Sequence, residues 1–257
     1  MQDFTTNKFN KTIISVSGFI LVFMIWTVLS RSYNSLILPS PEETGSALIA
    51  LVASGELFKN IIITVRRTLM GFILAVIFGI IFAILLNKRY ILRLIFKPLI
   101  TVIQTTPPVV WLALAVIWFG IAENITPVFL IFIVTFPIIF INIFEGLQNL
   151  NINLLEMAQV YEVRKRRIYL EIFLPDLIPS LVSSLTIGFA FAWKSSIFAE
   201  FIGSNSGIGY ALSRANSNLN TSELYAWTLI LIGLMLLVEY MLIKPLQRRV
   251  SRWKQYE

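Results

Sequence analysis

The chain has 257 residues, of which 57% are hydrophobic and only 14% are charged, whereas soluble domains carry about 25% charged residues. This composition indicates a membrane protein and leaves no room for a large soluble domain. The formal net charge is +7, which we attribute to cations gathered in cytoplasmic loops and not to nucleic-acid binding.

The sequence contains no cysteine and no histidine. Disulfides, thiolate chemistry, zinc sites of the usual Cys/His kind and a Ser-His-Asp triad are therefore excluded. No glycine is followed by lysine, so the chain lacks a P-loop. We expect no catalytic residue, no metal site and no cofactor in this chain, and we expect any ATP chemistry to lie on another subunit.

The first predicted element is a transmembrane helix from Thr12 to Ser30. This run carries no charge, and no small-residue cleavage site follows it, so we interpret it as a retained helix and not as a signal peptide. The next segment is typical of a helix start, because Ser40 can cap, Pro41 suits the first helical position and Glu43 can complete a capping box. We expect a short interfacial helix here, on the outer side.

The second and third predicted spans contain arginines and a double proline. Thr68 to Asn87 is free of charge and long enough to cross a bilayer, and we expect Arg66 and Arg67 to snorkel from its outer end. Pro98 to Ala122 contains Pro107-Pro108, which removes two backbone donors and disfavours helix before each proline. Either a kinked span or a kink that lines a translocation path fits this pattern.

Three further spans complete a prediction of six transmembrane helices. They are Asn124 to Phe144, Leu177 to Phe198, which Lys194 interrupts, and Leu224 to Ile243. Most of the 21 Lys and Arg residues fall in the segments that this topology places inside, in agreement with the positive-inside rule. We therefore predict an all-α membrane protein with both termini in the cytoplasm.

One polar stretch, residues 150–179, stands out from the apolar chain. Asn153 and Glu156 are typical of a capped helix start, and the run from Arg164 to Arg167 contains four consecutive cations. A second helical stretch, Lys165 to Phe173, is expected to end at Pro175, because helices usually stop before the residue that precedes proline. Two short amphipathic helices joined at a corner would form a cytoplasmic docking knob; the alternative is a re-entrant or interfacial loop.

The spacing in this stretch resembles the EAA loop of ABC-importer permeases, whose pattern is Glu-Ala-Ala, three residues, Gly, nine residues, Ile-x-Leu-Pro. Here Glu156-Met157-Ala158 begins the pattern and Ile172-Phe173-Leu174-Pro175 ends it at the right distance. Met157 replaces an alanine. Glu162 replaces the glycine, and a glycine there would let the chain turn through a left-handed conformation. Either the corner is built differently here, or Glu162 accepts the backbone strain.

The resemblance extends from about residue 36 to 250 and is to the nitrate/sulfonate/taurine branch of these permeases. The further segments that carry it are Leu38-Pro39-Ser40-Pro41, Thr64 to Gly71, Pro107-Pro108, Trp118-Phe119-Gly120, Ala199-Glu200 and Ser206-Gly207-Ile208-Gly209-Tyr210.

The resemblance to these permeases implies a type I importer (MetI-like) permease fold in a bacterial inner membrane. The chain would form one transmembrane domain over residues 1–257, with a core of about 60–245. The resemblance also implies a second, commonly identical, permease copy, a cytoplasmic ATPase dimer that carries ATP and Mg, and an extracytoplasmic solute-binding protein.

The resemblance makes the EAA loop (residues 150–179) the ATPase-docking element. We assign docking to these residues: Glu156, Ala158, Tyr161, Glu162, Arg164, Leu174 and Pro175. We assign the translocation path to Lys194, Glu200, Pro107 and Pro108. A charge such as Lys194 within a span costs roughly 2.5–3.5 kcal/mol at mid-helix and usually faces an interior or a cavity. It would suit an anionic solute, unless it is a structural anchor or is paired with Glu200.

The sequence thus predicts the permease subunit of an ATP-driven, binding-protein-dependent importer for a small anionic solute of the sulfonate, taurine or nitrate kind. The alternative is a secondary transporter driven by an ion gradient. That alternative needs carboxylates within the spans, whereas Glu145, Glu200 and Glu239 all lie near the ends of the predicted helices.

Overall fold

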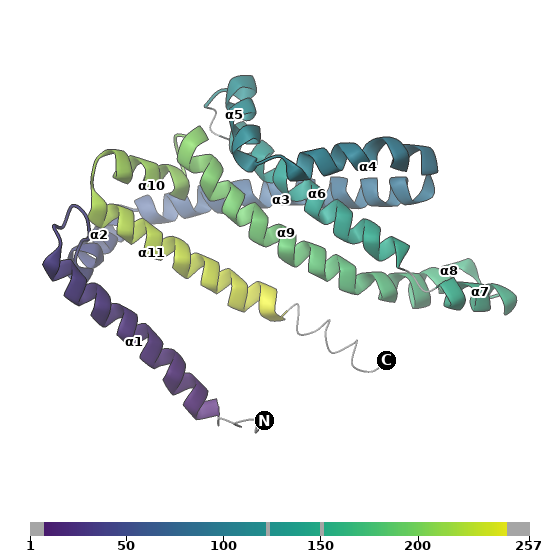
Figure 1. The fold of residues 1–257 in the computed structure, drawn as a ribbon, viewed down its shortest axis with the longest axis horizontal. Helices are drawn as coiled ribbons and strands as arrows, with labels where there is room; N and C mark the ends of the chain where they lie inside the picture. The colour runs from purple at the N-terminus through teal and green to yellow at the C-terminus, as the bar shows by residue number, and fades with distance from the viewer. Residues whose placement is uncertain (1–7, 122–123, 150–151, 246–257) are drawn as a thin grey trace. The chain divides into compact units, whose positions relative to one another are not determined.

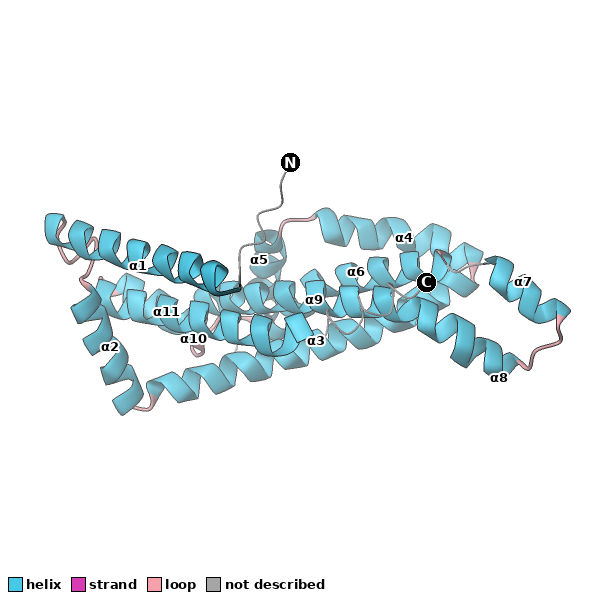
Figure 2. Ribbon diagram, turned by 90° about the horizontal axis from the view of Figure 1, so that it is seen from below, coloured by secondary structure: helices cyan, strands magenta, loops and turns pink. Residues whose placement is uncertain are grey.

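The protein is described by a computed structural model that covers residues 8–121, 124–149 and 152–245. Every regular element in these ranges is a helix, which confirms the all-α class (Figure 2). Contacts divide the described chain into two compact units. One contains residues up to Phe58 together with Leu212–Ile230, and the other contains Lys59–Ala211 together with the residues from Leu231 onward.

The first unit is built from N-terminal helices and the beginning of the last long helix. Its elements are α1 (Lys8–Ser32), α2 (Pro41–Ala53), the end of α10 (Ile208–Ser217) and the first part of α11 (Thr221–Val238). The predicted capping box at the start of α2 is confirmed. The Glu43 backbone N–H donates to Ser40 Oγ at 3.2 Å, and the Ser40 N–H donates to Glu43 Oε2 at 2.8 Å.

An aromatic stack and an arginine with two carboxylate partners are among the side-chain contacts within this first unit. Trp26 of α1 stacks on Tyr225 of α11 with ring centroids 6.2 Å apart. Arg214 of α10 donates to Glu56 at 2.6 Å and to Glu223 at 3.1 Å. These two carboxylates raise the pKa of Arg214, chiefly through the hydrogen bond to Glu56, so the guanidinium stays protonated at any physiological pH.

The second unit contains the longest helices. Its elements are α3 (Glu56–Lys88), α4 (Tyr90–Thr105), α5 (Pro108–Phe119), α6 (Ile125–Gln148), α7 (Ile152–Val160), α8 (Lys165–Ile168), the π-helical η1 (Tyr169–Phe173), α9 (Leu174–Gly203) and the π-helical η2 (Glu239–Ile243). Glycines let the long helices approach closely. A Cβ on Gly71 of α3 would lie 2.6 Å from Ile131 of α6, and one on Gly146 of α6 would lie 2.5 Å from Ser180 of α9.

Phenylalanines fill the space between α3, α4 and α6. Along α6, Phe136, Phe140 and Phe144 follow one another at one-turn intervals with centroids 6.3 and 5.4 Å apart. Phe82 of α3 meets Phe96 of α4 and Phe136 edge to face at 5.9 and 5.6 Å. Such aromatic pairs favour edge-to-face and offset geometry, so they fix the orientation of the three helices.

The double proline breaks its helix, as the sequence predicts. The axes of α4 and α5 differ by 97° at Thr106-Pro107, and Figure 1 shows α5 turning away from the line of α4. The expected start of this span at Pro98 is wrong, because α4 begins at Tyr90 and passes through Pro98. A single missing N–H leaves the neighbouring turns bonded and does not by itself end a helix.

Among the described residues, four helices are long and apolar enough to cross a membrane. They are Glu56–Lys88, Ile125–Gln148, Lys165–Gly203 and Thr221–Met241, and the bent pair α4–α5 would make a fifth. The described part of α1 adds a shorter apolar helix, Ile20–Ser32.

Pro175 does not end its helix, contrary to the sequence-based expectation. The chain remains helical from α8 through η1 into α9, and Pro175 lies in the first turn of α9. The π-helical turn Tyr169–Phe173 immediately precedes it. A π turn pairs each N–H with a carbonyl five residues back, which accommodates the backbone ahead of a residue that lacks an N–H. The EAA loop therefore continues into α9 as one helix (Figure 2).

Candidate functional site

The corner of the EAA loop is a helix C-terminus in a left-handed conformation. Glu162, which stands at the glycine position, has φ +53°. The Tyr161 N–H donates to Met157 O at 3.1 Å, and the Val163 N–H donates to Ala158 O at 3.0 Å. The second bond spans five residues, as in a Schellman motif. Glu162 therefore makes the turn that glycine makes in the motif, at a cost of about 1 kcal/mol.

A second helix begins directly after this corner. Arg164 O accepts from the N–H groups of Arg167 and Ile168 at 2.8 and 3.2 Å, so Arg164 starts α8. The Arg167 side chain pairs with Glu171 one turn later at 2.8 Å. Both groups are exposed, and this pair contributes only about 0.3–0.5 kcal/mol.

A groove of about 190 Å³ lies between the two arms of the loop. Its lining residues are Met157, Ala158, Tyr161, Val163, Arg167, Ile168, Glu171 and Ile172. Ala158 is only 4% exposed. Ala158 therefore lies inside the corner, on the wall of this groove.

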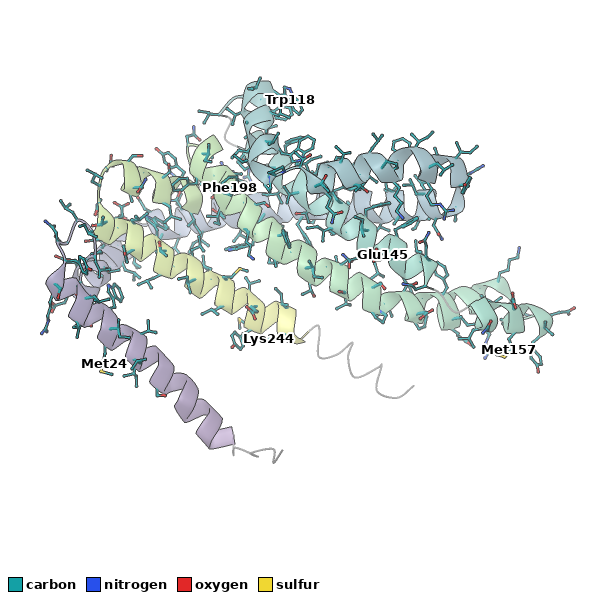
Figure 3. All side chains as sticks on the ribbon, viewed as in Figure 1. Met24, Trp118, Glu145, Met157, Phe198 and Lys244 are labelled. Atoms are coloured by element: carbon teal, nitrogen blue, oxygen red, sulfur yellow. The ribbon has the colours of Figure 1, made fainter. Side chains whose placement is uncertain are left out.

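The outer surface of the EAA loop presents apolar side chains to solvent. Val160 is 80% and Tyr161 75% exposed, and Met157, whose side chain Figure 3 labels on this loop, is 53% exposed. Of the predicted docking residues, Glu156, Glu162, Arg164 and Leu174 are also exposed, and Pro175 is half-buried. Exposed apolar groups beside cations are typical of a surface that another protein covers.

The predicted path residues lie in three different settings. Pro107 and Pro108 are exposed at the break between α4 and α5. Lys194 is exposed on α9, with its Nζ 5.9 Å from the centroid of the Phe191 ring. The exposed neighbours of Lys194 on this face are apolar: Ile187, Phe191, Phe198, Phe201 and Ile202. Glu200 is fully buried, so it is not part of this face.

Glu200 pairs with Arg67 and not with Lys194. Arg67 Nη1 donates to Glu200 Oε1 at 2.9 Å, and the two side chains are 1% and 0% exposed. The expectation that Arg67 snorkels from the end of a span is wrong: α3 begins at Glu56, so Arg67 lies within the helix and faces α9. A partner on another helix makes burial less costly than an unpaired charge would be.

Further hydrogen bonds complete this site, here called the Arg67 cluster (Thr64, Arg67, Glu200 and Ser206). Thr64 Oγ1 donates to Glu200 Oε2 at 2.7 Å and accepts from the Ile208 N–H at 2.9 Å. Arg67 Nη1 and Nη2 donate to the Ser206 carbonyl and hydroxyl oxygens at 2.7 and 2.8 Å. Arg67 carries the positive charge of the cluster and Glu200 the negative charge, and every other partner is neutral. The cluster therefore carries no net charge.

Two outlying contacts extend the cluster along the chain. Arg67 Nε donates to Asn124 Oδ1, at the start of α6, at 3.2 Å. The Gly209 N–H donates to Glu200 Oε2 at 3.1 Å. Gly207 has φ +99°, and a Cβ there would overlap the Glu200 carboxylate. The glycine is required both by the left-handed backbone and by this close approach.

Sequence reasoning missed the roles of Thr64, Arg67 and Ser206. Two signals pointed to them. A charge within a helix that crosses a bilayer needs a partner, which applies to Arg67 and Glu200 together. Glycines two residues apart, Gly207 and Gly209, indicate a close backbone approach. Neither signal identifies which of the distant charges is the partner.

Apolar helices long enough to cross a bilayer and a cytoplasmic-type helical loop with exposed apolar side chains are typical of a membrane protein that another protein contacts at this loop. A comparison with protein families identifies the class further. Residues 75–256 match the family described as "Binding-protein-dependent transport system inner membrane component". The chain belongs to this family of ABC-transporter permeases, in which ATP hydrolysis resides on a separate subunit.

Curated relatives cover nearly the whole chain. SsuC of Escherichia coli (strain K12), described as a putative aliphatic sulfonates transport permease protein, is 30% identical over 90% of this chain and 88% of its own length. The taurine transport system permease protein TauC of the same organism is 26% identical over 91% of this chain and 86% of its own.

Among solved structures, an inward-facing MetNI methionine ABC transporter matches with a TM-score of 0.61 at 16% identity, over 73% of this chain and 93% of that one. At this identity the likeness concerns the fold alone, and it supports a MetI-like permease architecture.

Proposed function

We propose that this permease works as a homodimer in the bacterial inner membrane, with six spans per copy and both termini in the cytoplasm. A cytoplasmic ATPase dimer, which binds ATP and Mg, drives it, and an extracytoplasmic binding protein delivers a small organic anion such as a sulfonate. The observation that carries the proposal is the EAA loop: its corner has the backbone expected of the motif's glycine, and its exposed surface carries apolar side chains beside charged ones.

The docking role rests on the loop's exposed residues. Glu156, Tyr161, Glu162, Arg164 and Leu174 would contact the ATPase, with Pro175 at the base. Ala158 has a different part in docking, because it is buried inside the corner. It preserves the shape of the loop that the ATPase meets.

The solute class rests on Lys194 and on the names of the relatives. An ammonium group on an otherwise apolar exposed face of α9 is too costly to leave in lipid. It therefore lines the space between two permease copies, where it attracts an anion. Pro107 and Pro108 would shape the same path. Glu200 does not line the path in this proposal, because its carboxylate is buried in an ion pair with Arg67. The secondary-transporter alternative thereby loses Glu200 as a carboxylate that could couple transport to an ion gradient.

Uptake in cells tests the proposal. A strain that lacks this gene is complemented with the wild type, Lys194→Arg or Lys194→Gln and supplied with taurine or an aliphatic sulfonate as sole sulfur source. We expect growth with wild type and Lys194→Arg and little growth with Lys194→Gln at equal protein levels. Wild-type growth of the Gln variant would contradict the path role. Absence of complementation by the wild type on every sulfonate would contradict the solute class.

A further inference from the structure

The Arg67 cluster stands at the far end of the helix that begins in the EAA loop. The chain stays helical from Lys165 to Gly203, including the π-helical turn Tyr169–Phe173, and this length corresponds to about 58 Å at the α-helical rise of 1.5 Å per residue. Glu200 lies in the last turn of this helix. A continuous helical backbone therefore connects α8, at one end, with Glu200 at the other.

Packing alone does not explain why charges occupy this position. Apolar residues of similar volume would hold two helices together at least as well as a buried ion pair, because desolvation costs several kcal/mol per ion. What the ion pair adds is a fixed geometry for the hydrogen bonds of its guanidinium group. Arg67 has five donors in a fixed plane, and those that bond in the structure bind the end of α9, the Ser206 backbone and the start of α6 at once.

The segment 204–209 is tied to the same group through its backbone. The Ser206 carbonyl accepts from Arg67, the Ile208 N–H donates to Thr64, and the Gly209 N–H donates to Glu200. The Gly207 N–H also donates to Asn60 Oδ1 of α3 at 3.0 Å. The segment therefore has little freedom to move independently of α3 and of the last turn of α9.

We propose that the Arg67 cluster is a coupling joint: it makes the last turn of α9, the turn Thr64–Arg67 of α3 and the segment 204–209 move as one body when the ATPase displaces the EAA loop. Thr64, Arg67 and Glu200 are then positioning residues for transport, which act through the backbone of 204–209. The inference rests on the proposed docking role of the EAA loop.

A matched pair of threonines on α3 allows a mild test. Thr64→Val removes the hydroxyl that joins Glu200 to Ile208. Thr68 lies one turn further along the same helix and is equally buried, but its hydroxyl donates to the Thr64 carbonyl of its own helix. Thr68→Val therefore controls for the loss of a buried hydroxyl without touching α9 or the segment 204–209.

The chain has no cysteine, so Asn205→Cys introduces a single thiol at an exposed position between Ser204 and Ser206. The complete complex with its ATPase is reconstituted in nanodiscs and labelled with a hydrophilic maleimide, without nucleotide and after trapping with ATP and vanadate. We expect the labelling rate in the Asn205→Cys protein, alone and with Thr68→Val, to change about fivefold or more between the two states, as for usual coupling energies. We expect Thr64→Val to abolish most of that change.

Either of two results would overturn the proposal: a labelling rate independent of nucleotide in the Asn205→Cys protein, or equal nucleotide dependence with Thr64→Val and Thr68→Val. Failure of the docking role has a different signature, because the ATPase would then not co-purify with the wild-type chain. Since the readout needs no solute, it is also independent of the solute's identity.

Discussion

Removal of one charge from the Arg67–Glu200 pair should be the most damaging conservative change in this protein. Glu200→Gln keeps the shape of the side chain and removes its negative charge. The Arg67 guanidinium, 1% exposed, then retains only neutral acceptors on Ser206, Asn124 and the new amide. An unpaired buried charge of this kind costs about 3–5 kcal/mol, a large part of the roughly 5–15 kcal/mol by which proteins are typically stable.

The double variant Arg67→Met/Glu200→Gln removes both charges and should regain most of that loss, because a well-packed neutral pair needs no desolvation of ions. A loss of about 3–5 kcal/mol corresponds to roughly a 10²–10⁴-fold change in the folding equilibrium. Each single variant should therefore accumulate poorly in the membrane and unfold at a much lower temperature.

Thermal unfolding of the detergent-purified protein, followed by size-exclusion chromatography, measures the effect. Arg167→Met is a suitable control, since it breaks the exposed pair with Glu171 and should change the midpoint little. If Glu200→Gln unfolds at the wild-type temperature, or if the double variant is no more stable than either single variant, the pair is not the buried and mutually dependent unit described above.

Five further variants test other parts of the fold. Glu162→Gly should stabilise the loop corner by up to about 1 kcal/mol, seen as slower hydrogen exchange in α7; faster exchange would contradict the left-handed corner. Gly55→Ala should cost about 1 kcal/mol, because φ is +74° in open space. Gly207→Ala should lower the unfolding temperature further, since its Cβ also meets a carboxylate; equal losses would argue against that contact. Ala158→Asp should abolish co-purification of the ATPase and loosen the loop in hydrogen exchange, whereas Val160→Asp, on the exposed surface, should weaken co-purification alone; an intact complex with Ala158→Asp would refute the buried position.

Features that depend on neighbouring residues could be predicted from the sequence. The capping box of Ser40 and Glu43 is confirmed because both partners lie within one turn. The break at Pro107-Pro108 is confirmed because two adjacent prolines leave the helix without consecutive donors. The EAA spacing placed Glu162 at the glycine position but left open whether the corner is built differently or Glu162 accepts the strain, and its φ of +53° shows that it adopts the left-handed conformation.

Features that depend on residues far apart in the chain could not be predicted from the sequence. Nothing near Arg67 indicates that its partner lies 133 positions later in the chain, so snorkelling was the simplest local interpretation. The rule that proline ends a helix failed at Pro175 because a π turn ahead of it accommodates the backbone. The roles of Lys194 and of the docking residues stay predictions, because they depend on partner chains.

The helix Lys165–Gly203 is about twice as long as the hydrocarbon core of a bilayer is thick, at about 58 Å against about 30 Å. Much of it must therefore stand outside the lipid. Membranes differ in thickness by a few Å, and such a difference would only change how much of the helix is wetted. The distance from the EAA loop to Glu200 is fixed by one covalent helix. The distance between the EAA loop and Glu200 should therefore be the same in thin and thick membranes.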